Sequence, residues 1–401
     1  MDAQTIGMIV FFLLLGIFLF IKRKSITIDK IAFPLIYMFM FRTKLGLKTM
    51  DKMAKKFNKP LLYLGYFGIV IGFIGMVVIP VMLITNLYDV LFVPGAASGV
   101  TTVLPFEVKG AIFVPFFYYI ICLIIIASIH EFAHGIVARA HGIKIKSSGF
   151  AFICFIIPII PVAFVEPDEK QLTKSKRRAQ LSVFAAGPLA NILLGIICGL
   201  MLAFVFVPAM ADMQAGVSVN SLILDAHNAS PANASGIYSG STIISLDGNP
   251  TQTTESFKQL MSAKKPGDTA SVVLSDGTKH NVVLGTDPSN ASKSFMGVSV
   301  FQKVEVTPVA KQKYGFFASW IIWLSGLFTW LVILNIGIGT FNLVPLGPID
   351  GGRMLLTSLE WKLKKKNARQ IWNAVSIALL LLIAVSILFA LKPWEWFGLF
   401  R

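Results

Sequence analysis

The stretch AIFVPFFYYIICLIIIASIHEFAHGIVA, residues 111–138, decides the fold class and locates the chemistry. It is long enough to cross a bilayer, which needs about 20 mostly apolar residues. Its second half nevertheless carries His130, Glu131 and His134. Ionisable side chains are costly inside a membrane, so their presence in a span indicates a functional site. The alternative is a helix end at the membrane interface, because Arg139 follows closely.

The spacing of the two histidines predicts a metal site. His130 and His134 are four residues apart, which places them about 40° apart on a helix and one turn along it. Both imidazoles can therefore bind one ion. Glu131 is offset by one residue and can reach a water molecule at the metal without being a ligand.

The composition of the whole chain agrees with a membrane protein. Of 401 residues, 55% are hydrophobic and 14% are charged, whereas soluble domains carry about 25% charge. This excludes a single soluble globule and a disordered chain. The three cysteines lie in apolar runs, so no disulfide framework or cysteine-rich zinc module is predicted. The net charge of +16 does not indicate nucleic acid, because the basic residues flank apolar spans.

We predict a polytopic α-helical membrane protein with about six transmembrane helices, at residues 5–21, 61–87, 111–138, 179–207, 316–342 and 371–391. The first span lacks a preceding basic residue, so it is not interpreted as a cleavable signal. Of 36 basic residues, 11 + 8 + 6 = 25 fall in three segments that six crossings place on one side: 22–60, 139–178 and 353–370. The positive-inside rule makes that side the cytoplasm, with both termini outside in a cell membrane.

Two further apolar stretches do not fit as single crossings, because basic residues flank both of them. Residues 31–41 are interpreted as an interfacial segment. Residues 149–165 are rich in Phe and Ile and are interrupted by Pro158 and Pro161. They predict a re-entrant β-like hairpin. Irregular backbone at membrane depth needs protein or a watery cavity beside it, so a water-accessible site is expected nearby.

Residues 213–305 are polar and predict a small α+β domain outside the cytoplasm. Residues 241–250 read as a strand and an Asp-Gly turn, 254–263 as a short helix, and 269–285 as a hairpin around Asp276-Gly277. This order resembles a PDZ domain of membrane and envelope proteases, although Gly240-Ser241 replaces the usual Gly-Asp. Two roles remain open: binding an extended peptide or regulator, and limiting access as a rigid spacer.

A catalytic zinc site usually has three protein ligands, so a third ligand must come from elsewhere. His141, His227 and His280 are expected to be solvated. Asp350 is the better candidate, because it follows a Pro- and Gly-rich run, FNLVPLGPIDGGRM (341–354), at the same predicted depth as the histidines. A helix N-cap near Arg353 is the alternative role for Asp350.

Three motifs together resemble the site-2 protease family of intramembrane zinc metalloproteases. They are HExxH, GPLAN (187–191) and N-x-x-P-x-x-x-x-D-G (342–351), in the family order. The resemblance covers about residues 111–360. It implies that His130, His134 and Asp350 bind Zn²⁺ and that Glu131 is the catalytic glutamate. Asn191 and Asn342 match motif asparagines that assist substrate or transition-state binding.

The expected activity is hydrolysis of peptide bonds in or near a transmembrane segment of a membrane-protein substrate, as in regulated intramembrane proteolysis. Glu131 is expected to act as the general base and Asn191 as an oxyanion donor, or else as a polar residue joining helices. A strand edge within 145–165 is expected to pair with the unwound substrate. The alternatives are a metal-ion transporter and a non-catalytic membrane adaptor. No second copy of the motifs supports a transporter, and intact Glu131 opposes an adaptor.

The expected division of the chain has four parts. These are 1–60, with the first transmembrane helix and a basic interfacial segment; 61–207, with the HExxH and GPLAN helices; 208–310, the PDZ-like domain; and 311–401, with the Asn-Pro-Asp-Gly motif and the last helix.

Overall fold

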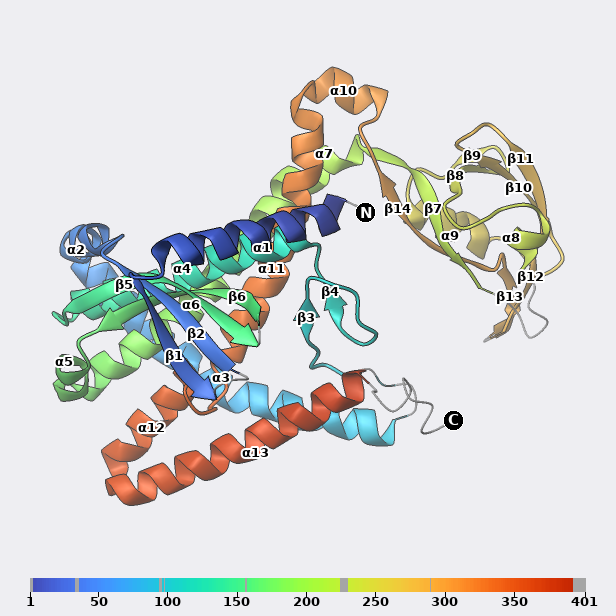
Figure 1. Cartoon of the computed structure of the whole chain (residues 1–401). Coiled ribbons are helices and arrows are strands. Elements are labelled where there is room, and N and C mark those ends of the chain that lie inside the picture. The colour runs from blue at the N-terminus through green and yellow to red at the C-terminus, as the bar shows by residue number, and fades with distance from the viewer. Residues whose placement is uncertain are drawn as a thin grey trace. The chain divides into compact units, whose positions relative to one another are not determined.

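The structure is a computed structural model that describes residues 3–32, 36–93, 96, 98–155, 157–223, 230–288 and 290–391. The chain divides into two compact units (Figure 1). The first contains Met1–Gly199 and Leu327–Arg401, and the second contains Leu200–Gly326. Each unit has its own core of buried apolar side chains.

Among the described residues, six helices are long and apolar enough to cross a membrane, which agrees with the number of spans expected from the sequence. They are α1 (Ala3–Lys22), α3 (Asn58–Phe92), α4 (Phe116–Ala140), α6 (Arg177–Met201), α11 (Phe317–Phe341) and α13 (Lys365–Leu391). The span that begins with α6 continues through a π-helical turn, Leu202–Phe206, and α7 (Val207–Ala211). The chain is therefore a multi-pass membrane protein.

Small residues allow α3 to pack closely in the first unit. Gly65, Gly68, Gly72 and Gly75 recur every three or four residues, so they lie along one buried face of α3. A Cβ atom at Gly68 would meet Ala185 and Leu189 of α6, at 3.3 and 3.2 Å. Close helix contact of this kind is typical of membrane helices, in which small residues let the backbones approach.

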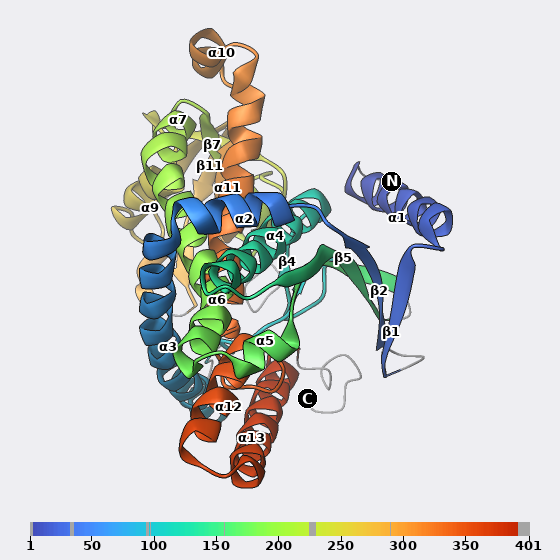
Figure 2. The same cartoon turned by 90° about the vertical axis from the view of Figure 1, so that its left-hand side faces the viewer.

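The first unit also contains a four-stranded antiparallel sheet in the order β1-β2-β5-β6. Its strands are β1 (Ile26–Ala32), β2 (Ile36–Thr43), β5 (Ile145–Phe155) and β6 (Ile157–Pro167). The hairpin expected at 149–165 is present as β5 and β6, apart from residue 156, which lies outside the described residues. Figure 2 shows β1 and β2 beside β5.

The stretch 31–41 contributes to a strand that pairs with β5, which was not predicted from the sequence. Its described residues are strand backbone, and β2 pairs with β5 from Ile36 opposite Phe155 to Thr43 opposite Ser148. Residues 33–35 lie outside the described part. Because β2 pairs with one side of β5, the hairpin edge that has no partner strand among the described residues is that of β6.

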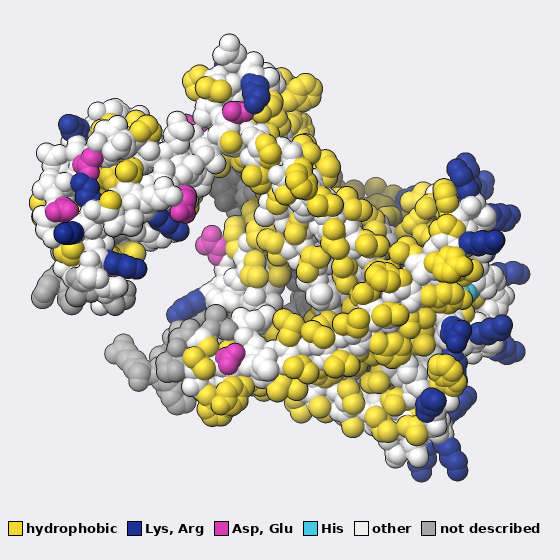
Figure 3. Space-filling view, turned by 180° about the vertical axis from the view of Figure 1, so that it is seen from behind, with side chains coloured by type: hydrophobic (Ala, Val, Ile, Leu, Met, Phe, Trp, Pro, Cys, Tyr) yellow, Lys and Arg dark blue, Asp and Glu magenta, His cyan; other side chains and the backbone are white. Residues whose placement is uncertain are grey.

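Three shorter helices and a small strand pair complete the first unit. The helices are α2 (Leu47–Lys56), α5 (Glu169–Lys174) and α12 (Asp350–Lys362). The strands β3 (Val103–Leu104) and β4 (Ile112–Phe113) are parallel. Figure 3 shows apolar side chains over the visible face of this unit and Lys and Arg side chains gathered at one end.

The second unit contains an antiparallel sheet in the order β11-β10-β8-β7-β14, with β9 paired to β8. Its elements are β7 (Gln214–Leu222), α8 (Pro231–Ala234), β8 (Thr242–Leu246), β9 (Asn249–Pro250), α9 (Thr254–Ser262), β10 (Thr269–Leu274), β11 (Lys279–Val283), β12 (Gly285–Asp287), β13 (Asn290–Phe295), β14 (Val298–Val304) and α10 (Pro308–Tyr314).

The local patterns expected in the second unit are present. Asp247 and Gly248 both have positive φ, as a tight two-residue hairpin turn requires. Thr253 and Ser256 form a capping box at the start of α9. The expected hairpin of 269–285 is β10 and β11. Each of these features depends on residues close in sequence.

Candidate metal centre

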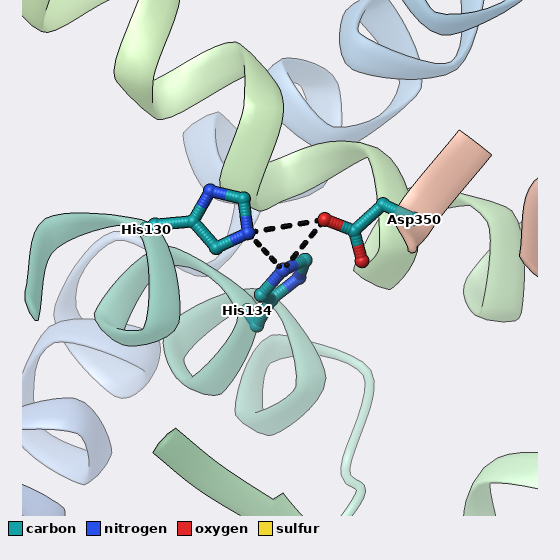
Figure 4. A group of neighbouring side chains, drawn as sticks. All are labelled: His130, His134 and Asp350. Atoms are coloured by element: carbon teal, nitrogen blue, oxygen red, sulfur yellow. Dashed lines mark hydrogen bonds and ion pairs between the residues drawn. The ribbon is translucent and has the colours of Figure 1, made fainter. Parts of the chain in front are cut away.

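Three side chains from two distant parts of the chain meet in the first unit (Figure 4). His130 and His134 lie on α4, and Asp350 is the first residue of α12. One ligand atom of each lies within 4.8 Å of the others. Their side chains are only 11 to 14% exposed, so the group is largely shielded.

The distances between the ligand atoms suit a zinc ion. The two Nε2 atoms are 3.1 Å apart, and Asp350 Oδ2 lies 3.0 Å from His130 Nε2 and 3.3 Å from His134 Nε2. A tetrahedron with metal–ligand bonds near 2.0–2.1 Å has edges of about 3.3 Å. Three ligands of this kind leave a fourth position for water or substrate.

One face of α6 lies against the two histidines, at three positions spaced four residues apart. Val183 offers its carbonyl oxygen 2.6 Å from His134 Nδ1, and the Asn191 amide lies 3.0 Å from His130 Nδ1. Between them, a Cβ atom at Gly187 would clash with the Nε2 atoms of both histidines. Contacts at Nδ1 direct each Nε2 towards the metal position, which is how outer contacts usually orient histidine ligands.

Two glycines hold Asp350 at the start of α12. The Gly351 N–H donates to the Asn342 carbonyl oxygen at 2.7 Å, which folds the motif back on the end of α11. A Cβ atom at Gly351 or Gly352 would meet backbone carbonyl oxygens, so neither position has room for a side chain. The Asp350 carboxylate contacts both histidines instead of capping a helix.

The charge state of Asp350 agrees with a ligand role. Burial by itself would raise the pKa of this carboxyl group. The charge and hydrogen bonds of His134 and His130 outweigh burial and hold the pKa of this carboxyl group below its ordinary range, so Asp350 is ionised beside them.

Glu131 lies beside the cluster and contacts the sheet. Its Oε2 atom accepts a hydrogen bond of 2.9 Å from the Val165 N–H of β6. Among the described residues, the group that could hold a metal does not include Glu131. The glutamate thus joins the metal centre to the unpaired edge of the hairpin.

The structure places the two motif asparagines differently. Asn191 is fully buried against His130, and its Oδ1 atom has no hydrogen-bond partner in the part of the chain that the structure describes. The Asn342 side chain donates to the Ile338 carbonyl oxygen at 2.9 Å, within its own helix. Asn191 is therefore part of the centre, whereas Asn342 contacts it only through its backbone and Gly351.

Among the described residues, the group that could hold a metal does not include His141 or His280, and solvation was the wrong expectation for His141. It is half-buried, its Nε2 lies 3.1 Å from Ser182 Oγ, and burial lowers the pKa of its imidazole. His280 Nδ1 lies 2.7 Å from the Ser235 carbonyl oxygen. His227 lies outside the described residues.

Sequence reasoning missed the backbone groups of Val183 and Val165, because any residue type can supply a carbonyl or an N–H. The position of Gly187 could have been interpreted from the sequence. It lies four residues before Asn191, so both occupy one face of α6.

The comparisons with known proteins show the family. Residues 118–383 match the model of peptidase family M50. The chain belongs to peptidase family M50. It is an intramembrane metalloprotease, and its metal is Zn²⁺.

Three curated proteins that match this chain differ in identity and coverage. A protein of Methanocaldococcus jannaschii, itself uncharacterised, is 26% identical over 78% of this chain and 75% of its own length. A protein of Xylella fastidiosa named as a zinc metalloprotease is 28% identical over 38% of each chain. The regulator of sigma E protease of Haemophilus influenzae is 26% identical over 39% of each chain.

A solved PDZ domain of an SdrC-like protein from Listeria monocytogenes is 25% identical to part of this chain. The match covers 21% of this chain and 86% of that domain, with a TM-score of 0.18.

Proposed function

We propose that His130, His134 and Asp350 hold the zinc ion of this M50 peptidase and that Glu131 is its general base. The observation that carries the proposal is the convergence of three ligand atoms beside Glu131. The substrate is a membrane protein, cleaved in or near a transmembrane segment.

The chain's own residues account for the proton transfers. When bound, zinc supplies Lewis acidity, which polarises the scissile carbonyl and lowers the pKa of a water molecule. Glu131 takes a proton from the attacking water and returns it to the leaving amine. The Val165 N–H holds the glutamate carboxylate in place for both steps.

The first experiment compares wild type with Glu131→Gln on a single-span reporter, with zinc measured on the same samples. We expect zinc in both proteins and cleavage by wild type alone, because Gln cannot accept the proton. Absence of zinc from both would contradict the ligand assignment. Equal cleavage by both would contradict the role of Glu131.

Asn191 is assigned here as a positioning residue for His130. With Nε2 directed at the metal, His130 Nδ1 carries the proton and needs an acceptor. A half-turn of the Asn191 amide, whose oxygen and nitrogen have nearly the same shape, would bring Oδ1 to that position. This would also satisfy the buried oxygen that lacks a partner.

Asn191→Asp separates this role from that of an oxyanion donor. Aspartate keeps the acceptor but loses the N–H, so zinc affinity is retained, whereas Asn191→Ala lowers it roughly 10- to 100-fold. Retained zinc with lost cleavage in Asn191→Asp would favour the oxyanion role. Zinc titration and reporter cleavage measure the two effects separately.

The unpaired edge of β6 is the proposed docking strand for the unwound substrate. Val165 directs its N–H away from β5 towards Glu131, so Ala163, two residues away, presents its N–H on the same edge. Pro161, two residues before Ala163, lies on the same edge. Proline has no N–H, and this is tolerated where the edge of a sheet is unpaired. A strand added here would run directly to Glu131.

The arrangement across the membrane is proposed from charge. The basic end of the first unit faces the cytoplasm, with the hairpin re-entrant and water reaching the zinc from that side. Residues 208–310 of the second unit then lie outside the cytoplasm as a PDZ-like domain. Its proposed role is to bind an extended peptide or to keep bulky substrates away.

A further inference from the structure

A cavity of about 600 Å³ opens among three helices of the first unit and takes no part in the proposed catalysis. Helix α3 supplies one wall, the first turns of α6 a second, and the last turns of α12 a third. Its lining residues are Tyr66, Ile69, Phe73, Arg178, Leu181, Ser358, Trp361 and Lys362.

The cavity combines apolar walls with unpaired positive charge. Among the described residues, neither Arg178 nor Lys362 has a carboxylate within ion-pair distance, and no acidic side chain is in the lining. The nearby Glu360 is paired with Arg177, at 3.8 Å. Lys362 Nζ lies 5.8 Å from the centre of the Trp361 ring. Two cations without counter-charges favour an anionic ligand.

The aromatic side chains show that the ligand is also apolar. Trp361, Tyr66 and Phe73 are 56, 41 and 39% exposed, although each borders the cavity. Tyr66, Ile69 and Phe73 follow one face of α3, a helix long enough to span the membrane. Trp and Tyr beside cations are typical of the level of lipid headgroups.

We propose that this cavity binds one anionic phospholipid from the bilayer leaflet at the basic end of the unit. Its phosphate lies between Arg178 and Lys362, and its acyl chains lie along Ile69, Phe73 and Leu181. Basic pockets between membrane helices bind acidic headgroups in this way. A free phosphate ion would satisfy the cations and leave the apolar walls exposed, so the bilayer is the source.

The lipid would connect the metal centre to its membrane. Asp350 begins α12, and Trp361 and Lys362 lie at the other end of the same short helix. A lipid that bridges this end to α3 and α6 therefore holds the helix that carries the metal ligand. We expect bound lipid to raise the unfolding temperature of the protein.

The test uses the delipidated full-length protein in detergent, with phosphatidylglycerol or phosphatidylcholine added and native mass spectrometry as the readout. The test variant is Arg178→Gln/Lys362→Gln. The matched control, Lys48→Gln/Lys52→Gln, removes the same charge from exposed positions of α2. We expect one tightly retained phosphatidylglycerol in wild type and control. Retention by the test variant should be about thirtyfold weaker.

A second measurement tests whether the lipid binds beside Trp361. Brominated phosphatidylglycerol should quench a component of the fluorescence that is missing from Trp361→Phe. The proposal is overturned if test variant and control retain phosphatidylglycerol equally, or if phosphatidylcholine binds as tightly. It is also overturned if millimolar inorganic phosphate displaces the bound lipid. Equal zinc content and equal unfolding temperature of the lipid-free variants confirm that both are folded.

Discussion

At the scale of single residues, one stripe of α6 shapes the metal centre. Val183, Gly187 and Asn191 are four residues apart, and each contacts one or both histidines. Only one of the three does so through a polar side chain. The geometry of the proposed zinc site therefore depends on the backbone of α6 and on the absence of a side chain at Gly187 as well as on the proposed ligands.

Gly187→Ala should remove most of the zinc. Its new methyl group would occupy the position of the histidine Nε2 atoms, so the imidazoles would have to turn away. We expect zinc affinity to fall roughly tenfold or more, as when outer support of a ligand is lost. Zinc titration of the purified protein measures this.

Gly199→Ala is the matched control on the same helix. A Cβ atom there meets only Val332, at an ordinary 3.8 Å. Its zinc affinity should equal that of wild type. If Gly187→Ala bound zinc as tightly as this control, the close approach of α6 to the histidines would be refuted.

At the scale of elements, the sheet and α4 meet through Glu131 and β6. The β5–β6 hairpin is paired on one side with β2, and its other side contacts Glu131, the proposed general base. Substrate pairing and proton transfer would thus involve one strand, because the Val165 N–H contacts Glu131 and the Ala163 N–H lies on the same edge of β6.

Ala163→Pro should abolish or greatly reduce reporter cleavage without loss of zinc. Proline removes an N–H from the edge proposed to pair with substrate, while the bonds between β5 and β6 are unaffected. Ala163→Val keeps the N–H and serves as the control. Full cleavage by the proline variant would refute the docking edge.

At the scale of the whole molecule, charge and hydropathy set the expected topology. Six apolar helices among the described residues and a basic end indicate a membrane protein, whereas residues 213–305 of the second unit are rich in polar residues. Each unit has its own core, and both belong to one continuous chain.

Single-cysteine labelling tests the proposed orientation in a background that lacks Cys122, Cys154 and Cys198. An impermeant maleimide should label Lys279→Cys of the second unit in intact cells. It should label Lys366→Cys, at the start of α13, only after lysis. Both positions are exposed, so access depends on the membrane. The opposite pattern would invert the topology.

Much of the molecule was predictable because its signals are local. A membrane span requires only a long apolar run, and the His130–His134 pair follows from the period of a helix. The turns and capping box of the second unit likewise depend on adjacent residues. Asp350 was predicted as a ligand from its motif, because the residue by itself was equally compatible with a helix N-cap.

The sequence by itself determined the membrane class, the six spans and the residue types of a zinc peptidase. The tertiary structure decided which distant segments meet: Asp350 with His130 across 220 residues, β2 with β5, and Val165 with Glu131. The physical reason is that hydropathy and helical period act between neighbours. The partner of a strand or the space beside a glycine depends on backbones far away in the chain.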